Sequence, residues 1–193
     1  MSDSIEKLRS LHRANRAALN ENTLHSNAAN LLLNVSAQNV YRRAQKVAAY
    51  IAIRGEIEVS GIITQGAQEG KQFYLPVLRD ESMYFVPWSP DQPLVKKQFG
   101  LLEPDVPLNQ SIAVHELDLV LAPLVVFDSR CNRIGQGGGF YDRTFAHKQH
   151  APTEKPVLMG VAHESQREDQ LSPESWDIPL DLIVTNASVY HRP

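Results

Sequence analysis

The residues from 133 to 143 are the strongest candidates for a chemical role in this chain, because four glycines lie within five positions between two arginines. The segment reads Arg-Ile-Gly-Gln-Gly-Gly-Gly-Phe-Tyr-Asp-Arg. Glycine lets other groups approach the backbone closely, at a cost in conformational entropy. Exposed backbone N–H groups beside arginine side chains attract anions. The segment therefore predicts an anion-binding loop, and a tight structural turn is the alternative.

The surroundings of this loop favour a phosphate over other anions. An apolar run at 119–127 precedes it, and a helix is expected to begin near Tyr141. Strand, glycine loop and helix is the order in which nucleotide phosphates are commonly held. The absence of a Gly-Lys-Ser/Thr sequence excludes a Walker A motif, and the spacing and late position exclude a dinucleotide fingerprint.

Two aspartates are candidates for a metal site. Asp142 follows the glycines, where a carboxylate beside bound phosphates is a natural Mg²⁺ ligand. It can equally favour a helix N-terminus or pair with Arg143. Asp177, within Trp-Asp-Ile-Pro, is either a turn former or a second metal ligand. The single cysteine, Cys131, excludes a cysteine-based zinc site and has no catalytic partner at a readable spacing.

Other polar residues each allow a functional and a structural interpretation. Arg9, Arg13 and Arg16 recur at i, i+4 and i+7 on a predicted helix, so they either reach a triphosphate or form a solvated face. Glu56 follows a strand and a glycine, where it can accept hydrogen bonds from a substrate amine or amide, or lie in a surface turn. His163 is either an acid or base, or a residue that orients its neighbours.

The segment from 87 to 109 is rich in proline and polar residues and has no clear period. Long loops of this kind within a domain often cover or bind a ligand. Its aromatic residues, Trp88 and Phe99, are expected either to stack on a planar ring or to hold the loop in place.

Apolar runs separated by helix-length segments predict an α/β fold with a largely parallel or mixed sheet and helices on both faces. Three helices are expected before residue 47, beginning near Ser4, near Asn22 or Thr23, and near Ser36. Another helix is expected at 59–68. The predicted strands are 47–53, 73–77, 83–86, 117–126, 157–162 and, as the last, 180–185. Because ligands bind at the carboxyl ends of parallel strands, the loops at 54–56, 128–142 and 163–166 should open on one edge.

The composition fits one globular domain spanning 1–193, with 42% hydrophobic and 21% charged residues. A net charge of −3 argues against a large nucleic-acid surface. No apolar stretch approaches the roughly 20 residues that span a bilayer. One cysteine and an N-terminus without a secretory pattern predict a cytoplasmic protein.

The 133–143 segment closely resembles the signature of the 5-formyltetrahydrofolate cyclo-ligase family, also called methenyltetrahydrofolate synthetase. The resemblance extends over nearly the whole chain through short blocks in the family's order. These blocks are Arg-Gly-Glu-Ile-Glu at 54–58, Tyr-Leu-Pro at 74–76, Glu-Pro at 103–104, Asp-Leu-Val-Leu-Ala-Pro-Leu at 118–124 and Pro-Leu-Asp-Leu-Ile-Val-Thr at 179–185. It implies a sheet architecture like that of ribose-phosphate isomerases and CoA transferases.

The family's reaction is the ATP-dependent conversion of 5-formyltetrahydrofolate to 5,10-methenyltetrahydrofolate, with ADP and phosphate as by-products. The resemblance therefore implies ATP and Mg²⁺ as cofactors, the folate as the small-molecule partner, and a monomer or weak homodimer. It also implies roles for individual residues. ATP binding falls to Arg9, Arg13, Arg133, Ile134, Gly135, Gln136, Gly137, Gly138, Gly139, Phe140 and Tyr141. Folate binding falls to Ile51, Glu56, Trp88, Gln136 and Phe140, metal binding to Asp142 and Asp177, and catalysis to Arg143 and Tyr141.

Some family members carry lysine where Gly138 stands here. Charge neutralisation would then depend more on Arg133, Arg143, the N-terminal arginines and Mg²⁺. A non-catalytic relative that binds folate or nucleotide is the alternative function. A sugar-phosphate isomerase or acyl-CoA transferase is a further one, and it rests on fold analogy alone.

Overall fold

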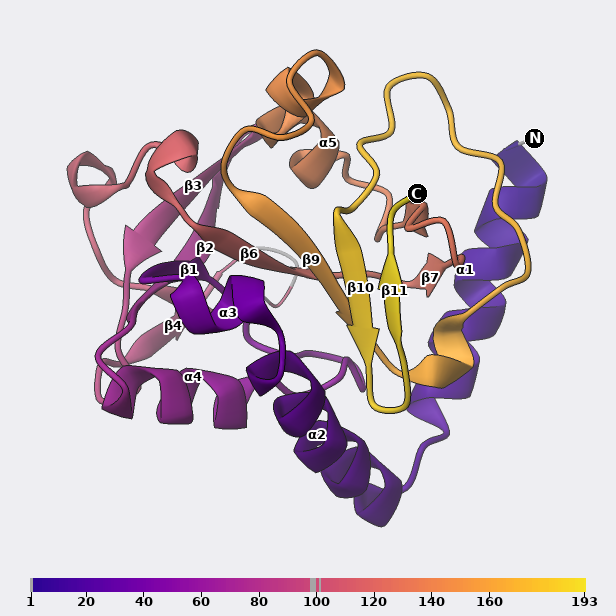
Figure 1. Cartoon of the computed structure of the whole chain (residues 1–193), viewed down its shortest axis with the longest axis horizontal. Coiled ribbons are helices and arrows are strands. Elements are labelled where there is room, and N and C mark those ends of the chain that lie inside the picture. The colour runs from indigo at the N-terminus through magenta and orange to yellow at the C-terminus, as the bar shows by residue number, and fades with distance from the viewer. Residues whose placement is uncertain (1, 98–99, 101) are drawn as a thin grey trace.

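A seven-stranded mixed sheet forms the centre of the computed structural model, which describes residues 2–97, 100 and 102–193 (Figure 1). Its strands are β1 (Lys46–Ala48), β2 (Gln72–Arg79), β3 (Ser82–Pro87), β6 (Leu119–Pro123), β9 (Val157–Ala162), β10 (Leu182–Thr185) and β11 (Val189–His191). They lie in the order β11-β10-β9-β6-β1-β2-β3. Strands β10, β9, β6, β1 and β2 run parallel, whereas β11 and β3 pair antiparallel at the two edges. The predicted α/β fold with a largely parallel or mixed sheet is confirmed.

The central strands are buried on both faces, which explains their continuous apolar sequences. Each residue of β10 and all but the first of β9 are buried, as are the first four of β6. Parallel sheets need this composition because helices or loops cover both of their faces.

The helices are α1 (Ser2–Ala17), α2 (Glu21–Ser36), α3 (Asn39–Arg43), α4 (Ser60–Gln68) and α5 (Phe140–Thr144). Short 3₁₀ turns are η2 (Leu108–Gln110), η3 (Val114–Glu116), η4 (Ala146–Gln149) and η5 (Glu164–Gln166). In the part of the chain that the structure describes, no helix is long and apolar enough to cross a membrane.

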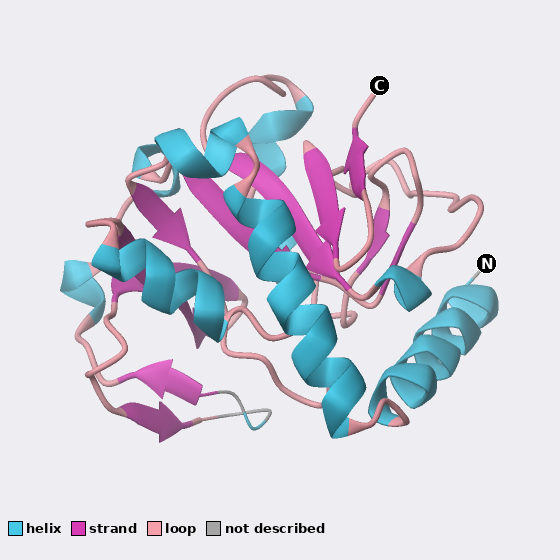
Figure 2. Ribbon diagram, turned by 60° about the horizontal axis from the view of Figure 1, so that its bottom comes forward, coloured by secondary structure: helices cyan, strands magenta, loops and turns pink. Residues whose placement is uncertain are grey.

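Helices α2, α3 and α4 cover one face of the sheet (Figure 2), where Leu31, Tyr41 and Ile62 pack against the strands. The other face packs against α5, the 178–180 segment and a small hairpin. Phe145, directly after α5, and Phe127, in the hairpin, are buried in this layer. This hairpin consists of β7 (Val126–Phe127) and β8 (Arg133–Ile134). It leads directly into the glycine loop, so the loop is held by a hairpin on one side and by α5 on the other.

Helix α1 packs outside these two layers, beside β7 and η5. Its Leu8 packs with Val125, Val126 and Leu171. The chain then turns into α2 at Asn20, whose side chain accepts a hydrogen bond from the Thr23 amide at 2.9 Å. This cap lies two residues before the predicted Asn22, since Asn20 provides the side-chain oxygen that the first turn needs.

Several predicted boundaries are wrong. The strand predicted at 47–53 ends at Ala48, and the buried residues after it are irregular, with the Tyr50 hydroxyl donating to the Ile57 carbonyl at 2.7 Å. The third helix begins after Gln38 rather than Ser36. The strand at 180–185 is not the last, because β11 follows it as an antiparallel edge strand. Apolar runs indicate burial, but burial alone does not distinguish a strand from a packed irregular segment.

The prediction of an irregular segment at 87–109 is also wrong in part. Strands β4 (Leu94–Lys96) and β5 (Leu102–Pro104) pair antiparallel within it. Buried Glu103 joins β5 to β2, since it accepts from the Leu78 amide at 3.0 Å and pairs with Arg79 at 3.0 Å. Phe99 lies outside the described residues.

Candidate functional site

The three loops predicted at one edge of the sheet do meet there. The His163 ring, after β9, contacts the carbonyl of Gly55, after β1, at 3.1 Å. Gln136 of the glycine loop donates from Nε2 to Oε1 of Glu56 at 3.0 Å. Gln166 donates to the Leu124 and Val125 carbonyls, both at 2.9 Å. These contacts join the carboxyl ends of β1, β6 and β9 into one site.

The glycine loop exposes backbone donors. Gly137 and Gly139 have φ values of +101° and +66°, which L side chains rarely adopt. None of the amides from residue 136 to 139 donates a hydrogen bond to another residue within the described chain. Residues 136–138 are exposed. The loop can therefore offer several N–H groups to an anion.

Two arginines of α1 dock on this loop. Arg9 donates from Nε to the Gly135 carbonyl at 2.9 Å. Arg13 donates to both the side-chain oxygen and the carbonyl of Gln136, at 3.1 and 3.0 Å. Both also pair with the exposed carboxylate of Glu6, at 3.1 and 3.4 Å. The stripe predicted on α1 therefore faces the glycine loop, and it brings two guanidinium groups beside the free amides.

Arg16, the third member of the stripe, has a different environment. It is 3% exposed, and its Nη1 lies 3.9 Å from Oε1 of Glu56. Glu56 is itself buried and accepts from Gln136 and from the Ile53 amide, the latter at 3.2 Å. Burial raises the pKa of Glu56, while Arg16 and these two hydrogen bonds oppose the rise. Glu56 is thus no surface turn residue.

His163 orients its neighbours. Its Nδ1 faces the Asn27 amide nitrogen at 2.9 Å, which requires Nδ1 to accept, so Nε2 carries the proton donated to the Gly55 carbonyl. Burial lowers the pKa of His163. A neutral imidazole with both nitrogens occupied fixes the turn before Glu56 and has no free position for acid or base work.

The Asp142 carboxylate lies against the glycine loop. Its Oδ1 accepts from both terminal nitrogens of Arg133, at 3.0 and 2.9 Å, and from the Ile178 amide at 3.1 Å. Asp142 therefore pairs with Arg133 and not with Arg143. Its Oδ2 accepts no hydrogen bond from another described residue, so this oxygen is available to a ligand.

Asp177 adjoins Ile178 and is thereby brought toward Asp142. Its Oδ2 accepts from the Glu174 amide at 2.8 Å, which closes a turn. Within the described residues there is no cluster of three or more His, Cys, Asp or Glu side chains arranged to hold a metal ion. One or two carboxylates fit Mg²⁺ only when substrate oxygens complete the coordination, which is the usual arrangement for this ion.

Tyr141 and Arg143 lie on α5 but face different surroundings. The Tyr141 ring stacks near Phe145 and lies 5.9 Å from the Arg133 guanidinium carbon. Burial raises the pKa of Tyr141, so its phenol stays protonated near neutral pH. Arg143 donates from Nε and Nη2 to the Glu81 carbonyl, at 3.1 and 3.0 Å, in the turn between β2 and β3.

The apolar residues predicted to contact folate fall into two groups. Ile51 and Trp88 are half-buried and pack against the cluster under α2, α3 and α4. The Trp88 indole N–H donates to the Gln92 carbonyl at 3.2 Å. Phe140 packs on the opposite face, with Arg143 over its ring at 5.0 Å.

Sequence reasoning missed Asp128, which shapes the hairpin before the loop. It is fully buried, and its oxygens accept from the amides of Arg130, Asn132 and Leu171, each at 3.0 Å. Aspartate before a polar turn was the available signal. Burial, together with Asp128, raises the pKa of neighbouring Cys131 to about 12, which agrees with the absence of thiol chemistry.

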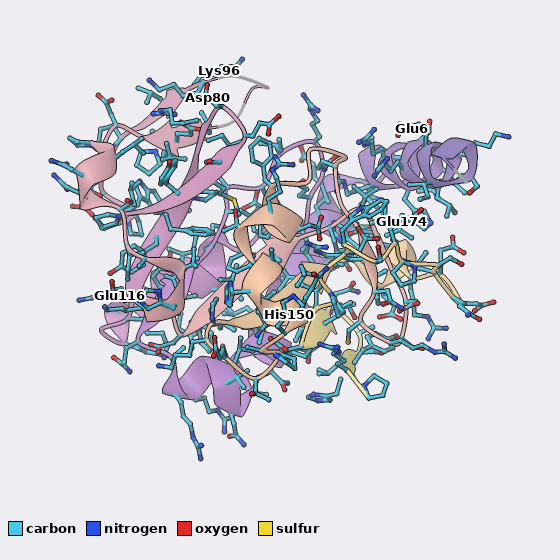
Figure 3. The ribbon with its side chains drawn as sticks, turned by 90° about the horizontal axis from the view of Figure 1, so that it is seen from above. Glu6, Asp80, Lys96, Glu116, His150 and Glu174 are labelled. Carbon is cyan, nitrogen blue, oxygen red and sulfur yellow. The ribbon has the colours of Figure 1, made fainter. Side chains whose placement is uncertain are left out.

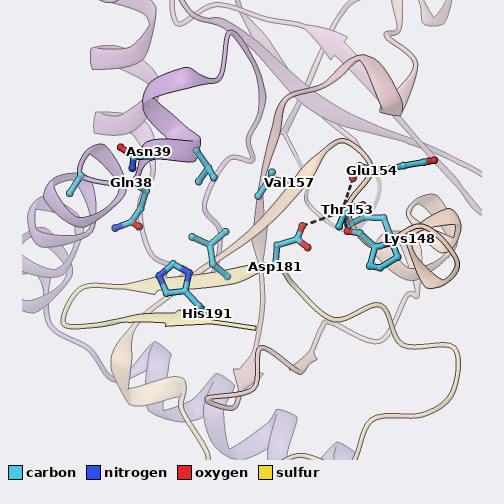
Figure 4. A pocket seen from close by; sticks show the side chains of 12 residues that line it. Gln38, Asn39, Lys148, Thr153, Glu154, Val157, Asp181 and His191 are labelled. Atoms are coloured by element: carbon cyan, nitrogen blue, oxygen red, sulfur yellow. Dashed lines mark hydrogen bonds and ion pairs between the residues drawn. The ribbon is translucent and has the colours of Figure 1, made fainter. Parts of the chain in front are cut away.

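A pocket of about 610 Å³ lies elsewhere, at the amino ends of the strands (Figure 4). Its walls come from the α2–α3 junction, the 152–154 segment, Asp181 and His191. Lys148 and Asp181 are paired in its wall at 3.2 Å. The pocket is separate from the glycine loop and contains none of the residues predicted for the site.

A family model described as "5-formyltetrahydrofolate cyclo-ligase family" matches residues 2–186. The 5-formyltetrahydrofolate cyclo-ligase of Haemophilus influenzae is 35% identical over 176 residues, covering 89% of this chain and 91% of the relative. The protein of the same name from Escherichia coli K12 is 38% identical over 150 residues, covering 76% and 81%. The NMR structure of Aquifex aeolicus 5,10-methenyltetrahydrofolate synthetase superposes with a TM-score of 0.82 at 25% identity, covering 97% of this chain and 92% of that one.

Proposed function

The chain belongs to the 5-formyltetrahydrofolate cyclo-ligase family, and we propose that it converts 5-formyltetrahydrofolate to 5,10-methenyltetrahydrofolate, with ATP going to ADP and phosphate. The observation that supports this best is Gln136, whose side-chain oxygen accepts from Arg13 and whose Nε2 donates to Glu56. The anion-binding loop and the buried carboxylate of Glu56 are therefore in direct contact. A reaction between a triphosphate and a ring system rich in N–H groups needs its two binding sites side by side in this way.

The chemistry explains why phosphate binding dominates the site. The formyl oxygen is a weak nucleophile, and oxide is a poor leaving group. In the proposed sequence this oxygen attacks the γ-phosphorus and the bond to ADP breaks. The folate N10 then adds to the formyl carbon, loses its proton, and phosphate departs with the former formyl oxygen. Such transfer depends on positioning and charge neutralisation more than on a protein nucleophile.

We assign the phosphates to the glycine loop. The amides from residue 136 to 139 supply N–H donors, and Arg9, Arg13 and Arg133 supply positive charge. These arginines already contact the loop or Asp142, so little side-chain entropy is lost when a triphosphate binds.

We assign the folate ring system to Glu56. An ionised carboxylate at the end of β1 can accept hydrogen bonds from ring N–H donors, and its burial strengthens them. Ile51, Trp88 and Phe140 are the proposed apolar contacts. Tyr141, held protonated, would act as a hydrogen-bond donor. Arg143 would neutralise charge after leaving the Glu81 carbonyl.

Mg²⁺ fits the carboxylates at this site. We propose Asp142 as its protein ligand through Oδ2, with Asp177 the second metal-associated carboxylate. When bound, Mg²⁺ would neutralise phosphate charge. A D142N variant separates this role from structure: turnover should need far more Mg²⁺, while D177N should shift the Mg²⁺ requirement less. Unchanged Mg²⁺ dependence in D142N would contradict the assignment.

The direct test mixes purified protein, Mg-ATP and 5-formyltetrahydrofolate and follows the absorbance of the methenyl product. We expect product and ADP in equal amounts. If calorimetry detects both ligands binding but no product forms, the protein is a non-catalytic relative. If turnover proceeds without ATP, an isomerase-like activity replaces the proposal.

Glu56 has a matched control two residues away. E56Q should raise the KM for folate about tenfold or more, because a neutral amide accepts hydrogen bonds less strongly than a carboxylate. Glu58 is exposed, so E58Q should leave both KM values unchanged. Equal effects of the two substitutions would remove Glu56 from the folate site.

We further propose that the protein acts in the cytoplasm as a monomer or weak homodimer. The single buried cysteine, which forms no disulfide, supports a reducing compartment.

A further inference from the structure

Arg16 differs from the other two arginines of α1 in what it contacts. Arg9 and Arg13 reach the glycine loop, whereas Arg16 lies beneath the turn that carries Glu56. Its Nε donates to the Arg54 carbonyl at 3.1 Å, and its Nη1 to the Leu124 carbonyl at 3.5 Å. At 3% exposure its guanidinium cannot reach a ligand in the open loop.

The turn above Arg16 places a non-glycine residue, Arg54, in the left-handed region of the backbone. Arg54 and Gly55 both have positive φ, at +51° and +73°. A Cβ at residue 55 would lie 2.9 Å from the Arg16 carbonyl oxygen, so α1 packs directly on the turn. Arg16 holds the Arg54 carbonyl from one side, and His163 holds the Gly55 carbonyl from the other. The two contacts fix where Glu56 leaves the turn.

The charge around Glu56 depends on the same residue. Among the described titratable and charged groups, those that face Glu56 are Arg16, Arg54, Tyr50 and Tyr141. The neutral Gln136 amide donates to it, and neutral His163 stands behind Gly55. Burial raises the pKa of Glu56, and Arg16 is the largest influence that opposes this. Burial also lowers the pKa of Arg16, while Glu56 opposes that change. Each group therefore favours the charged form of the other.

We propose that Arg16 is a positioning residue that keeps Glu56 ionised and aimed at the folate ring, without touching either substrate. This inference rests on the proposed function, because it assigns Glu56 to folate. It separates α1 into two functions: Arg9 and Arg13 serve the phosphate side, and Arg16 serves the folate side. A purely structural Arg16 would affect stability but not the ionisation of Glu56.

The kinetic test uses R16Q and R16K. In R16Q we expect the KM for folate to rise about tenfold or more while the KM for ATP changes less than about twofold, since only the folate side loses a charged contact. The acid limb of kcat/KM for folate should move to higher pH, because Glu56 gains a proton more readily without its cation. R16K keeps the positive charge, so its acid limb should match that of the unsubstituted protein. Its folate KM should still be raised, though less than in R16Q, because lysine cannot reproduce the guanidinium contacts.

A double variant distinguishes positioning from structure. If Arg16 acts through Glu56, R16Q/E56Q should have a folate KM within about twofold of E56Q alone, because coupled residues are not additive. Independent, additive effects would overturn the inference. If R16Q does not fold, R16K decides it: a folate KM identical to that of the unsubstituted protein would refute the positioning role.

A titration of Glu56 by carbon NMR, assigned with E56Q, tests the inference without turnover. R16Q should raise the pKa of Glu56 further, and R16K should not. If the unsubstituted protein forms no methenyl product, the proposed function fails while this titration still reports on Arg16. If turnover is normal but the pKa of Glu56 is unchanged in R16Q, the function stands and the inference fails.

Discussion

At the amino edge of the sheet, the ammonium of Lys148 has four oxygen acceptors around it, whereas at the carboxyl edge Arg16 and Glu56 approach only to 3.9 Å. Figure 3 shows Glu116, which precedes β6, and Glu6, on α1, on opposite sides of the molecule. Lys148 donates to the carbonyls of Pro152, Glu154 and Pro156, at 2.8 to 3.0 Å, and pairs with Asp181. Its three N–H groups are saturated.

The carboxyl edge keeps hydrogen-bonding capacity that the amino edge has used. Glu56 is buried with few partners, Asp142 has an available oxygen, and the loop amides at 136–139 have no acceptor within the described chain. Residues 136–138 are exposed, so their amides and the Asp142 Oδ2 can bind a ligand without breaking a hydrogen bond within the described chain. Charge burial alone therefore does not identify the site; spare donors and acceptors do.

The largest expected effect is a loss of stability at the amino edge, where every N–H group of Lys148 is bonded. K148M removes a buried ammonium, which leaves three carbonyls without this donor and Asp181 without its cation, and this should cost about 3–5 kcal/mol of unfolding free energy. Activity per folded molecule should not change, since Lys148 lies away from the glycine loop. Urea denaturation and the methenyl assay measure the two quantities.

The control for this prediction is K155M. Lys155 also pairs with an aspartate at this edge, Asp118, but its side chain is 64% exposed. Exposed ion pairs contribute about 0–1 kcal/mol, so K155M should be nearly neutral. If both substitutions cost the same, burial and saturation are not what distinguishes Lys148.

The next largest effect is a loss of ATP binding at the carboxyl edge, where the loop amides have no acceptor within the described chain. R13A removes a guanidinium that donates twice to Gln136 and lies beside the free amides. Loss of a charged hydrogen bond costs about 1.5–3 kcal/mol, which corresponds to roughly a tenfold to hundredfold fall in kcat/KM for ATP. Stability should change by less than about 1 kcal/mol, because Arg13 is partly exposed. The opposite pattern, a stability loss with normal ATP kinetics, would make Arg13 a structural residue.

The sheet was predictable because β6, β9 and β10 are continuous apolar runs, and parallel strands place their following loops at one edge. The irregular segment after β1 was not, since its residues 49 and 50 are as buried as a strand. In that segment hydrogen bonds of Tyr50 and Glu56 replace a ladder.

The sequence predicted which residues are candidates for the site, but not which of them contact one another. Arg9, Arg13 and Arg16 have the same helical spacing, yet the first two dock on the loop and the third is buried under a turn. Helical spacing fixes which face a side chain occupies, and what packs on that face depends on residues distant in sequence. Lys148, within a polar run, gave no signal of burial for the same reason.

The smallest predicted effect tests whether the amino edge is satisfied through charge. Asp118 accepts from the amides of Gln45 and Lys46, each at 2.9 Å, and pairs with Lys155. Burial raises its pKa, but the bonds from Lys155 and the two amides outweigh burial, so the pKa of Asp118 lies below its usual value. A lowered pKa stabilises the fold above the unfolded value of about 3.9, and this contribution is lost as the pH falls through the folded pKa. D118N should therefore cost about 1 kcal/mol at pH 7, the contribution of the charge to these hydrogen bonds, and progressively less as the pH falls from the unfolded value through the folded pKa. Urea denaturation across this pH range measures the difference, and a cost independent of pH would mean that shape rather than charge holds this edge together.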